Sequence, residues 1–257
     1  KEPTAVRWER NVPRWDAEAD VLVVGLGAAG ACAAIEAAEA GADVRVLERA
    51  SGGGGTSAMS TGQIYLGGGT AIQTACGFED SADEMYRYLV ASCGPAPDQA
   101  KIRAFCDECV GHYDWLVAHG GPFKDSFYGE GSYTPTDDCL SYSGSELAHP
   151  YPDIAKPAPR GHTVQQEGIE AGGQLMKSLI EAVDRTQAQV DVDVLGETLV
   201  LDDGGEAPTV LQIRQGRSSP THNVPSTSCF VRAHRSSARP HNPCRLRPRM
   251  LFRDLCR

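Results

Sequence analysis

The sequence has no long apolar run. Although 41% of its 257 residues are hydrophobic, no uninterrupted stretch approaches the roughly 18 residues that a membrane-spanning helix needs. The first residues also lack the charged, apolar and small-residue succession of a secretory leader, and the chain starts with Lys1 rather than Met. We therefore expect a cytoplasmic protein without a transmembrane segment.

The nine cysteines lack the regular spacing of a disulfide framework, which favours a reducing compartment. Cys106 and Cys109 form a CxxC pair, but no second pair or thioredoxin-like context accompanies it, so we expect neither metal nor redox function there. His112 and His119 lie on one helix face, and no cysteine or carboxylate completes a metal-binding set with them. The sequence therefore predicts no metal site.

Lysine is absent from the last 44 residues. Residues 214–257 carry ten arginines and one acid, Asp254, for a net charge of +9, whereas the preceding residues carry −19. This Arg-, Pro-, Ser- and Cys-rich composition shows no periodicity, which predicts disorder. A nucleic-acid-binding arm usually mixes Lys with Arg, whereas a GC-rich gene translated in the wrong frame yields this mixture. We therefore expect no nucleic-acid partner and a frameshifted, non-homologous tail; a basic arm and a tail of unknown use remain alternatives.

A strand–loop–helix–strand–acid pattern occupies residues 21–48. The apolar run Val21–Val24 leads into GLGAAG, in which Gly25 allows a tight turn, Gly27 lets the backbone approach a pyrophosphate, and Gly30 lets helix and strand pack closely. The following helix would direct its free N–H groups at the phosphates. Glu48 ends the second strand 18 residues after Gly30, where a carboxylate accepts ribose hydroxyls. The pattern predicts a dinucleotide site.

A second glycine-rich segment, residues 51–62, follows at once and indicates which dinucleotide is bound. Its backbone N–H groups and small hydroxyls suit a large flat ligand, and an FAD must be held far beyond the first loop, whereas nicotinamide cofactors need no such lobe. A flexible linker is the alternative. The predicted cofactor-binding residues are Gly25, Gly27, Ala28, Ala29, Gly30, Glu48, Arg49, Gly54, Gly55, Thr56, Ser57, Ser60, Thr61 and Gly62.

Over residues 15–205 the chain resembles the fumarate reductase/succinate dehydrogenase flavoprotein superfamily, and within it the actinobacterial 3-ketosteroid Δ4-(5α)-dehydrogenases. The matching motifs are Asp20–Gly30, Leu47–Arg49, Gly54–Ser57, Ile64–Thr70, Ala75–Phe78, His112–Val117, Pro122–Phe127, Tyr142–Gly144 and Pro157–His162. The first motif is shared by many flavoproteins, so the later motifs carry the assignment to the steroid branch.

The resemblance implies an FAD-dependent oxidoreductase acting on a CH–CH group. A ketosteroid substrate would lose a proton from one carbon and a hydride from its neighbour to the flavin, with an external electron acceptor. Thr56 and Ser57 stand where succinate dehydrogenases carry the histidine that bonds FAD, so the resemblance implies non-covalent FAD. The family's catalytic tyrosines lie beyond the matching part, so no catalytic residue is assigned and a truncated form is expected.

Two alternatives remain open. A soluble fumarate-reductase-like enzyme would present arginines to a dicarboxylate, and the body of this chain is poor in arginine. A non-catalytic fragment or pseudogene product is the other. For His162, a proton donor or substrate ligand competes with a loop histidine satisfied by backbone carbonyls, which is the commoner case.

The expected fold class is α/β, a Rossmann-like FAD-binding domain that is incomplete, with an irregular α-rich insertion and a disordered C-terminal tail. The domain covers residues 15–205 and the tail 206–257. Ser81 and Asp98 are expected to cap helices. The expected elements are strands at 19–25, 43–48 and 190–201, helices at 28–41, 81–93, 98–119 and 168–187, and an aperiodic segment at 120–162.

Overall fold

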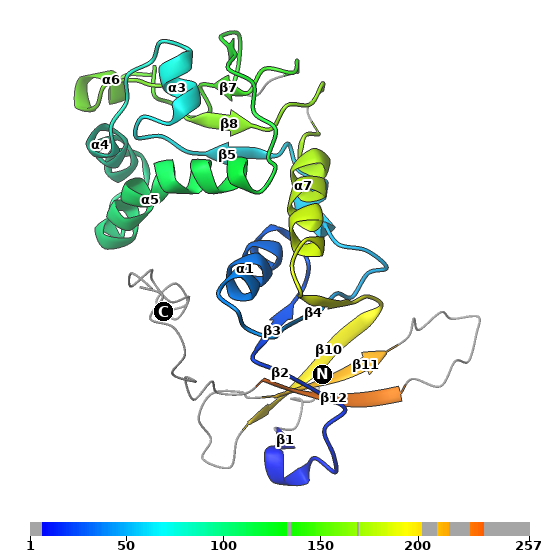
Figure 1. Cartoon of the computed structure of the whole chain (residues 1–257). Helices are drawn as coiled ribbons and strands as arrows, with labels where there is room; N and C mark the ends of the chain where they lie inside the picture. The colour runs from blue at the N-terminus through cyan, green and yellow to red at the C-terminus, as the bar shows by residue number, and fades with distance from the viewer. Residues whose placement is uncertain (1–6, 133–134, 169, 202–209, 216–226, 234–257) are drawn as a thin grey trace, which may run out of the picture.

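The βαβ unit predicted from the glycine motif is at the centre of the molecule (Figure 1). The computed structural model describes residues 7–132, 135–168, 170–201, 210–215 and 227–233. Three strands form a parallel sheet in the order β3-β4-β9, with Val21 opposite Val44 and Val46 opposite Val190. The elements of this unit are β3 (Val21–Val24), α1 (Ala28–Glu39), β4 (Val44–Leu47) and β9 (Gln189–Asp191).

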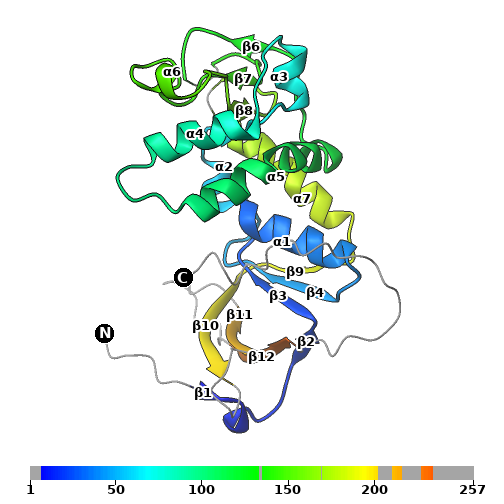
Figure 2. The same ribbon diagram turned by 90° about the vertical axis from the view of Figure 1, so that its left-hand side faces the viewer.

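Helices cover one face of this parallel sheet, and a second sheet packs against the other (Figure 2). The buried residues Ala31, Ala34 and Ile35 of α1 face Val23 and Val46 in the main hydrophobic core. Helix α7 (Gly172–Asp184) lies on α1 and adds an apolar stripe at helical spacing to the same core. The glycine loop is thereby fixed between a packed helix and a buried strand.

The strand expected at 190–201 is two strands that belong to different sheets. The extended conformation is interrupted at Asp193, which has a φ of 57°. The next strand, β10 (Val194–Leu201), belongs to a five-stranded sheet. We call this sheet, of order β1-β10-β11-β12-β2, the outer sheet. Its other strands are β1 (Arg7–Trp8), β2 (Ala17–Ala19), β11 (Val210–Gln215) and β12 (Thr227–Ala233).

Strands β11 and β12 differ from the expectation that the tail has no regular structure. They pair antiparallel with each other, while β11 pairs with β10 and β12 with β2. The strand conformation of β11 and β12 is stabilised by backbone hydrogen bonds to neighbouring strands, and local composition gives no information about such pairing. The outer sheet thus includes strands on both sides of the 205/206 boundary. The segments 202–209, 216–226 and 234–257 lie outside the described residues, so the disorder expected there stays a prediction.

The insertion between β4 and α7 is rich in helices, as expected. Ser81 accepts a hydrogen bond from the Glu84 N–H at 3.1 Å, and Asp98 accepts one from the Lys101 N–H at 3.1 Å, so both predicted caps are confirmed. The helices of the insertion are α2 (Gly55–Ala58), α3 (Ala71–Ala75), α4 (Ala82–Ser92), α5 (Gln99–Ala118) and α6 (Tyr151–Ile154). A short 3-10 helix, Glu9–Asn11, lies outside the insertion, near the N-terminus.

The insertion also contains a four-stranded sheet that the sequence did not predict. Two of its strands fall in the segment 120–162 and a third begins there. No periodicity was visible in this segment, because strands of two or three residues are too short to show one. This insertion sheet has the order β5-β8-β7-β6. Its strands are β5 (Gln63–Tyr65), β6 (Phe127–Tyr128), β7 (Leu140–Ser141) and β8 (Gly161–Thr163).

No helix in the described part of the chain is both long enough and apolar enough to cross a membrane.

Candidate functional site: two glycine loops on one helix

The first glycine loop closes tightly between β3 and α1. Gly25 follows β3 with a φ of 95°, and Gly27 is the N-cap of α1. A Cβ at Gly30 would lie 1.9 Å from the Gly25 carbonyl oxygen, so no other residue fits there without moving the loop. Ala28, Ala29 and Gly30 form the first turn of α1, where backbone N–H groups lack partners within the helix.

The structure brings the second glycine loop directly against the first. The Gly54 N–H donates to the Leu26 carbonyl at 2.7 Å, and the Ala28 N–H donates to the Ser57 hydroxyl at 3.3 Å. Gly55 and Thr56 are exposed beside this junction. Two segments that were predicted separately to hold one cofactor therefore form a single surface at the start of α1.

Glu48 has a structural role that the sequence did not reveal. Its carboxylate accepts the Leu26 N–H through Oε2 and the Ala50 N–H through Oε1, each at 2.7 Å, so it ties the first loop to the end of β4. Glu48 as a whole residue is 9% exposed. Each carboxylate oxygen has a second lone pair, so these contacts leave capacity for ribose hydroxyls. Arg49, the next residue, is exposed.

Residues 60–62 lie farther along the same surface, against the start of α7. The Gly172 N–H donates to the Ser60 carbonyl at 3.1 Å. Gly62 is buried with a φ of 68°, and a Cβ there would lie 2.5 Å from the backbone of Ala171. Ser60 and Thr61 are exposed. The helix start therefore fixes the path of this segment before it enters β5.

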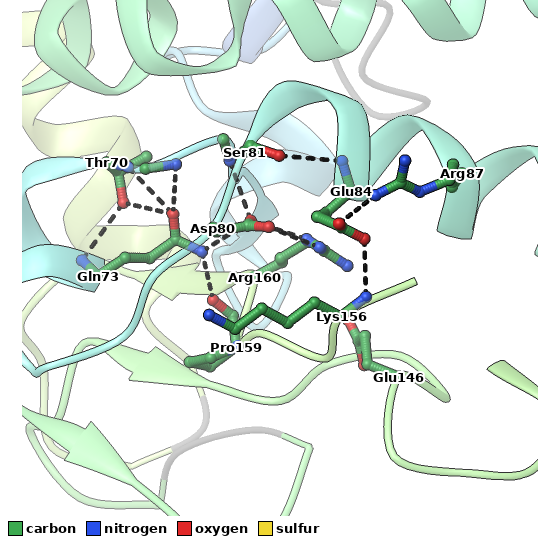
Figure 3. A network of polar contacts seen from close by, with 12 residues as sticks. Thr70, Gln73, Asp80, Ser81, Glu84, Arg87, Glu146, Lys156, Pro159 and Arg160 are labelled. Atoms are coloured by element: carbon green, nitrogen blue, oxygen red, sulfur yellow. Dashed lines mark hydrogen bonds and ion pairs between the residues drawn. The ribbon is translucent and has the colours of Figure 1, made fainter. Parts of the chain in front are cut away.

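A buried polar network holds the turn that follows β5 (Figure 3). Asp80 accepts from Arg160 Nε at 2.9 Å and Nη2 at 2.7 Å, and both side chains are 0% exposed. Asp80 also accepts the Gly68 N–H at 3.0 Å, while Gln73 accepts the Gly69 N–H at 3.0 Å. The network thus joins the glycine turn to the segment that leads into β8.

Charge complementarity maintains the ionised state of this pair. Burial by itself raises the pKa of Asp80, but the hydrogen bonds and charge of Arg160 outweigh it and hold that pKa below its ordinary value. Burial lowers the pKa of Arg160, and Asp80 raises it above its ordinary value. Arg160 lies within the Pro157–His162 motif, but no sequence signal could identify Asp80 as its partner, since the two residues are 80 positions apart.

His162 is a buried, neutral histidine on β8. Its Nδ1 lies 3.1 Å from the Arg160 carbonyl and its Nε2 lies 2.8 Å from the Thr70 hydroxyl. These partners suit a ring that donates from Nδ1 and accepts at Nε2. Burial lowers its pKa to about 4. This geometry matches the histidine satisfied by a backbone carbonyl and argues against a proton donor at neutral pH.

Metal or thiol chemistry finds no support in the described residues. No group of three or more His, Cys, Asp or Glu side chains among them could hold a metal ion. Cys106 and Cys109 are buried on α5, and burial raises the pKa of both thiols to about 11, so both stay protonated at neutral pH.

The geometry of the two loops fits an extended dinucleotide. At Gly25 and Gly55, no described atom other than those of the glycine and its two chain neighbours lies within 4 Å of the position that a Cβ would take, so the space beside the bare backbone is open to a ligand. The start of α1 presents N–H groups and helix-dipole charge suited to phosphate. Glu48 lies at the end of β4 and accepts the Leu26 N–H, and residues 60–62 contact the start of α7.

Comparisons with known proteins agree with this geometry. The family model described as FAD binding domain matches residues 20–239. The 3-oxo-5-alpha-steroid 4-dehydrogenase of Comamonas testosteroni is 35% identical over 211 residues, which is 74% of this chain and 39% of that protein. The chain therefore spans less than half the length of this relative.

Solved structures give the same picture. The 3-ketosteroid Δ4-(5α)-dehydrogenase of Rhodococcus jostii, in complex with 4-androstene-3,17-dione, superposes with a TM-score of 0.82 at 46% identity, covering 89% of this chain and 46% of that one. A flavocytochrome c3 fumarate reductase has a TM-score of 0.64 at 20% identity, covering 85% and 32%, and shows the shared fold alone. The chain belongs to the FAD-binding-domain family, and its cofactor is FAD.

Proposed function

We propose that this chain supplies the FAD-binding part of an oxidoreductase that dehydrogenates a 3-ketosteroid. The observation that carries the cofactor role is the junction of the two glycine loops, made by Gly54 and Leu26 on one side and Ser57 and Ala28 on the other. The substrate class is supported by the 46% identity with the Rhodococcus jostii enzyme. Bound FAD supplies a hydride acceptor, and an external electron acceptor would reoxidise it.

Each part of the surface has a distinct role in holding the cofactor. The first turn of α1 and the loop before it would bind the pyrophosphate, and Glu48 would accept the ribose hydroxyls. The segment from Gly54 to Ser57 would hold the middle of the molecule, and residues 60–62 would lie beside the ring. The segment 51–62 contains no His, Cys or Tyr, so we propose that FAD is held without a covalent bond.

The insertion offers little support for a dicarboxylate substrate. Its buried arginine, Arg160, has a side chain that is 0% exposed and forms two hydrogen bonds with Asp80, so its guanidinium is not accessible to a substrate carboxylate.

The cysteines described between residues 32 and 139 are all free, which supports a protein that works in a reducing compartment.

The cofactor role is tested by titrating the purified chain with FAD and following flavin fluorescence. Charge-assisted hydrogen bonds contribute about 1.5–3 kcal/mol each, so Glu48→Ala should raise the Kd for FAD at least about tenfold. Glu48→Asp should lose less. Glu181→Ala, which removes an exposed acid from α7, is the matched control and should bind as the parent does.

Because Glu48 also holds Leu26 and Ala50, the urea midpoint of each cofactor-free variant must be measured beside the Kd. A Glu48→Ala protein that is folded and binds FAD as tightly as the parent would show that the ribose assignment is wrong. Acid precipitation should release all bound flavin, and flavin that stays on the polypeptide would refute non-covalent binding. The substrate class is tested in a full-length context, with residues 1–205 joined to the remaining part of a full-length relative; 4-androstene-3,17-dione should then reduce an artificial electron acceptor, and no reduction would refute this substrate class.

A further inference from the structure

Helix α2, in the second glycine loop, has one packed side and one open side. On the packed side, a Cβ at Gly54 would lie 3.8 Å from the Cβ of Met176 on α7, and Ala58 packs against the main hydrophobic core. Met59 is the C-cap of the helix and is 76% exposed. No other large apolar residue in the described part of the chain has so large an exposed fraction.

The position of Met59 on the helix places it beside the open cofactor surface. Residues three and four positions apart share a face of a helix, so Met59 lies on the same face as Gly55 and Thr56. Both of these residues are exposed. At Gly55, apart from the glycine and its chain neighbours, no described atom lies within 4 Å of the position that a Cβ would take. The thioether of Met59 therefore borders the space that is open to a ligand.

The backbone around Met59 is fixed although the side chain is exposed. The Met59 N–H donates to the Thr56 carbonyl at 3.2 Å, and the Ser60 N–H donates to the Ser57 carbonyl at 3.3 Å. The Ser60 carbonyl accepts the Gly172 N–H at 3.1 Å, at the start of α7. The exposure of Met59 therefore does not come from a loose loop, because hydrogen bonds on both sides hold its backbone in place.

We propose that Met59 contacts the isoalloxazine ring of bound FAD. The ring is flat and largely apolar, and a thioether packs favourably against an aromatic ring. Met59 lies between Ser57, where the segment proposed for the middle of the cofactor ends, and Ser60, where the segment proposed for the ring begins. Those segments supply backbone N–H groups and hydroxyls, whereas Met59 supplies an apolar side chain. The inference rests on the proposed function of the two glycine loops.

Oxidation by dilute hydrogen peroxide in the dark, followed by peptide mass spectrometry, measures whether FAD covers Met59. Peroxide transfers one oxygen atom to the thioether sulfur and leaves as water, so a covered sulfur reacts more slowly. In the cofactor-free chain, Met59 should become the sulfoxide well before Met85 and Met176, which are 0% and 1% exposed. With FAD at about ten times its Kd, about one chain in eleven is free, so the oxidation of Met59 should slow about tenfold.

ADP is the control ligand, because it has the adenosine and pyrophosphate parts of FAD and lacks the ring. At a concentration that displaces FAD, ADP should leave Met59 as reactive as in the cofactor-free chain. Equal protection by ADP and FAD, or no protection by bound FAD, overturns the contact. Flavin fluorescence reports binding independently. A chain that binds no FAD refutes the proposed function, and the contact is refuted with it.

Substitution of Met59 gives a second readout. Met59→Gln should raise the Kd for FAD about threefold to tenfold, and Met59→Leu, which keeps an apolar side chain of similar size, should lose less. Val117→Gln is the control, because it makes the same kind of change at an apolar residue that is 46% exposed on α5, and its Kd should equal that of the parent. The urea midpoint of each cofactor-free variant should stay at the parent value, since the altered side chains are exposed. A folded Met59→Gln protein that binds FAD as tightly as the parent overturns the contact.

Discussion

Replacing Asp80 by Asn should destabilise the fold strongly, although it replaces only one carboxylate oxygen by an NH₂ group. The substitution removes the charge partner of Arg160, whose side chain is 0% exposed. It also places an NH₂ group where Asp80 accepts hydrogen bonds from Arg160 or from the Gly68 N–H at 3.0 Å. The buried guanidinium would be left with its charge uncompensated.

The size of the effect follows from burial. Removing one member of a buried ion pair costs about 3–5 kcal/mol, which is a large part of the total stability of a domain of this size. At an m-value of about 2 kcal/mol per molar urea, the loss corresponds to a midpoint lower by about 1.5 M or more. Adding Arg160→Met should recover part of the loss, because the double variant buries no unpaired charge.

Urea unfolding followed by tryptophan fluorescence and circular dichroism measures these midpoints. The matched control is Glu79→Gln, which makes the same chemical change one residue away, in a side chain that is 89% exposed and pairs with Lys156 at the surface. Its midpoint should equal that of the parent. If Asp80→Asn unfolds at the same urea concentration as the parent and Glu79→Gln, the buried pair does not stabilise the fold and the reasoning fails.

Three further predictions concern single positions. Gly30→Ala should lower the unfolding free energy by about 3 kcal/mol and abolish FAD binding, because its Cβ would lie 1.9 Å from the Gly25 carbonyl; a variant with the urea midpoint and Kd of the parent would contradict this. Because burial holds the pKa of His162 at about 4, the unfolded chain binds one more proton between about pH 4 and 6.5, and stability should rise with pH there by up to about 1.4 kcal/mol per unit; urea midpoints of His162→Gln should lack this slope. Ser81→Ala removes the acceptor for the Glu84 N–H and should cost about 1 kcal/mol in the same assay, with no change in the Kd for FAD.

The sequence predicted the elements whose signals are local. The strand, glycine loop, helix and acid of the βαβ unit lie within two residues of their expected positions, because each depends on residues adjacent in the chain. The caps at Ser81 and Asp98 are also local patterns. The sequence further predicted that both glycine segments would serve one cofactor, and the structure brings them together at Gly54 and Ser57.

The features that could not be predicted depend on residues far apart in the chain. The insertion sheet consists of strands of two or three residues, which are too short for a periodic pattern, and β11 and β12 are stabilised by neighbours rather than by composition. The strand expected at 190–201 is divided at Asp193, which has a left-handed backbone conformation. The sequence gives no signal for this conformation, because the residue is not a glycine. The pairing of Asp80 with Arg160 likewise depends on the tertiary fold, because the two residues are 80 positions apart.

The backbone around Glu48 also sets an order of events during synthesis. The Glu48 carbonyl accepts the Val194 N–H and the Ala50 carbonyl accepts the Asp193 N–H, both at 2.9 Å. Asp193 and Val194 are synthesised more than 140 residues after Glu48 and Ala50. At about 5–20 residues per second this interval is about 7–30 seconds. During that time the first βαβ unit has its glycine loop but not the strand that fixes its acidic end. The proposed cofactor site is therefore completed only after β9 and the start of β10 have been synthesised.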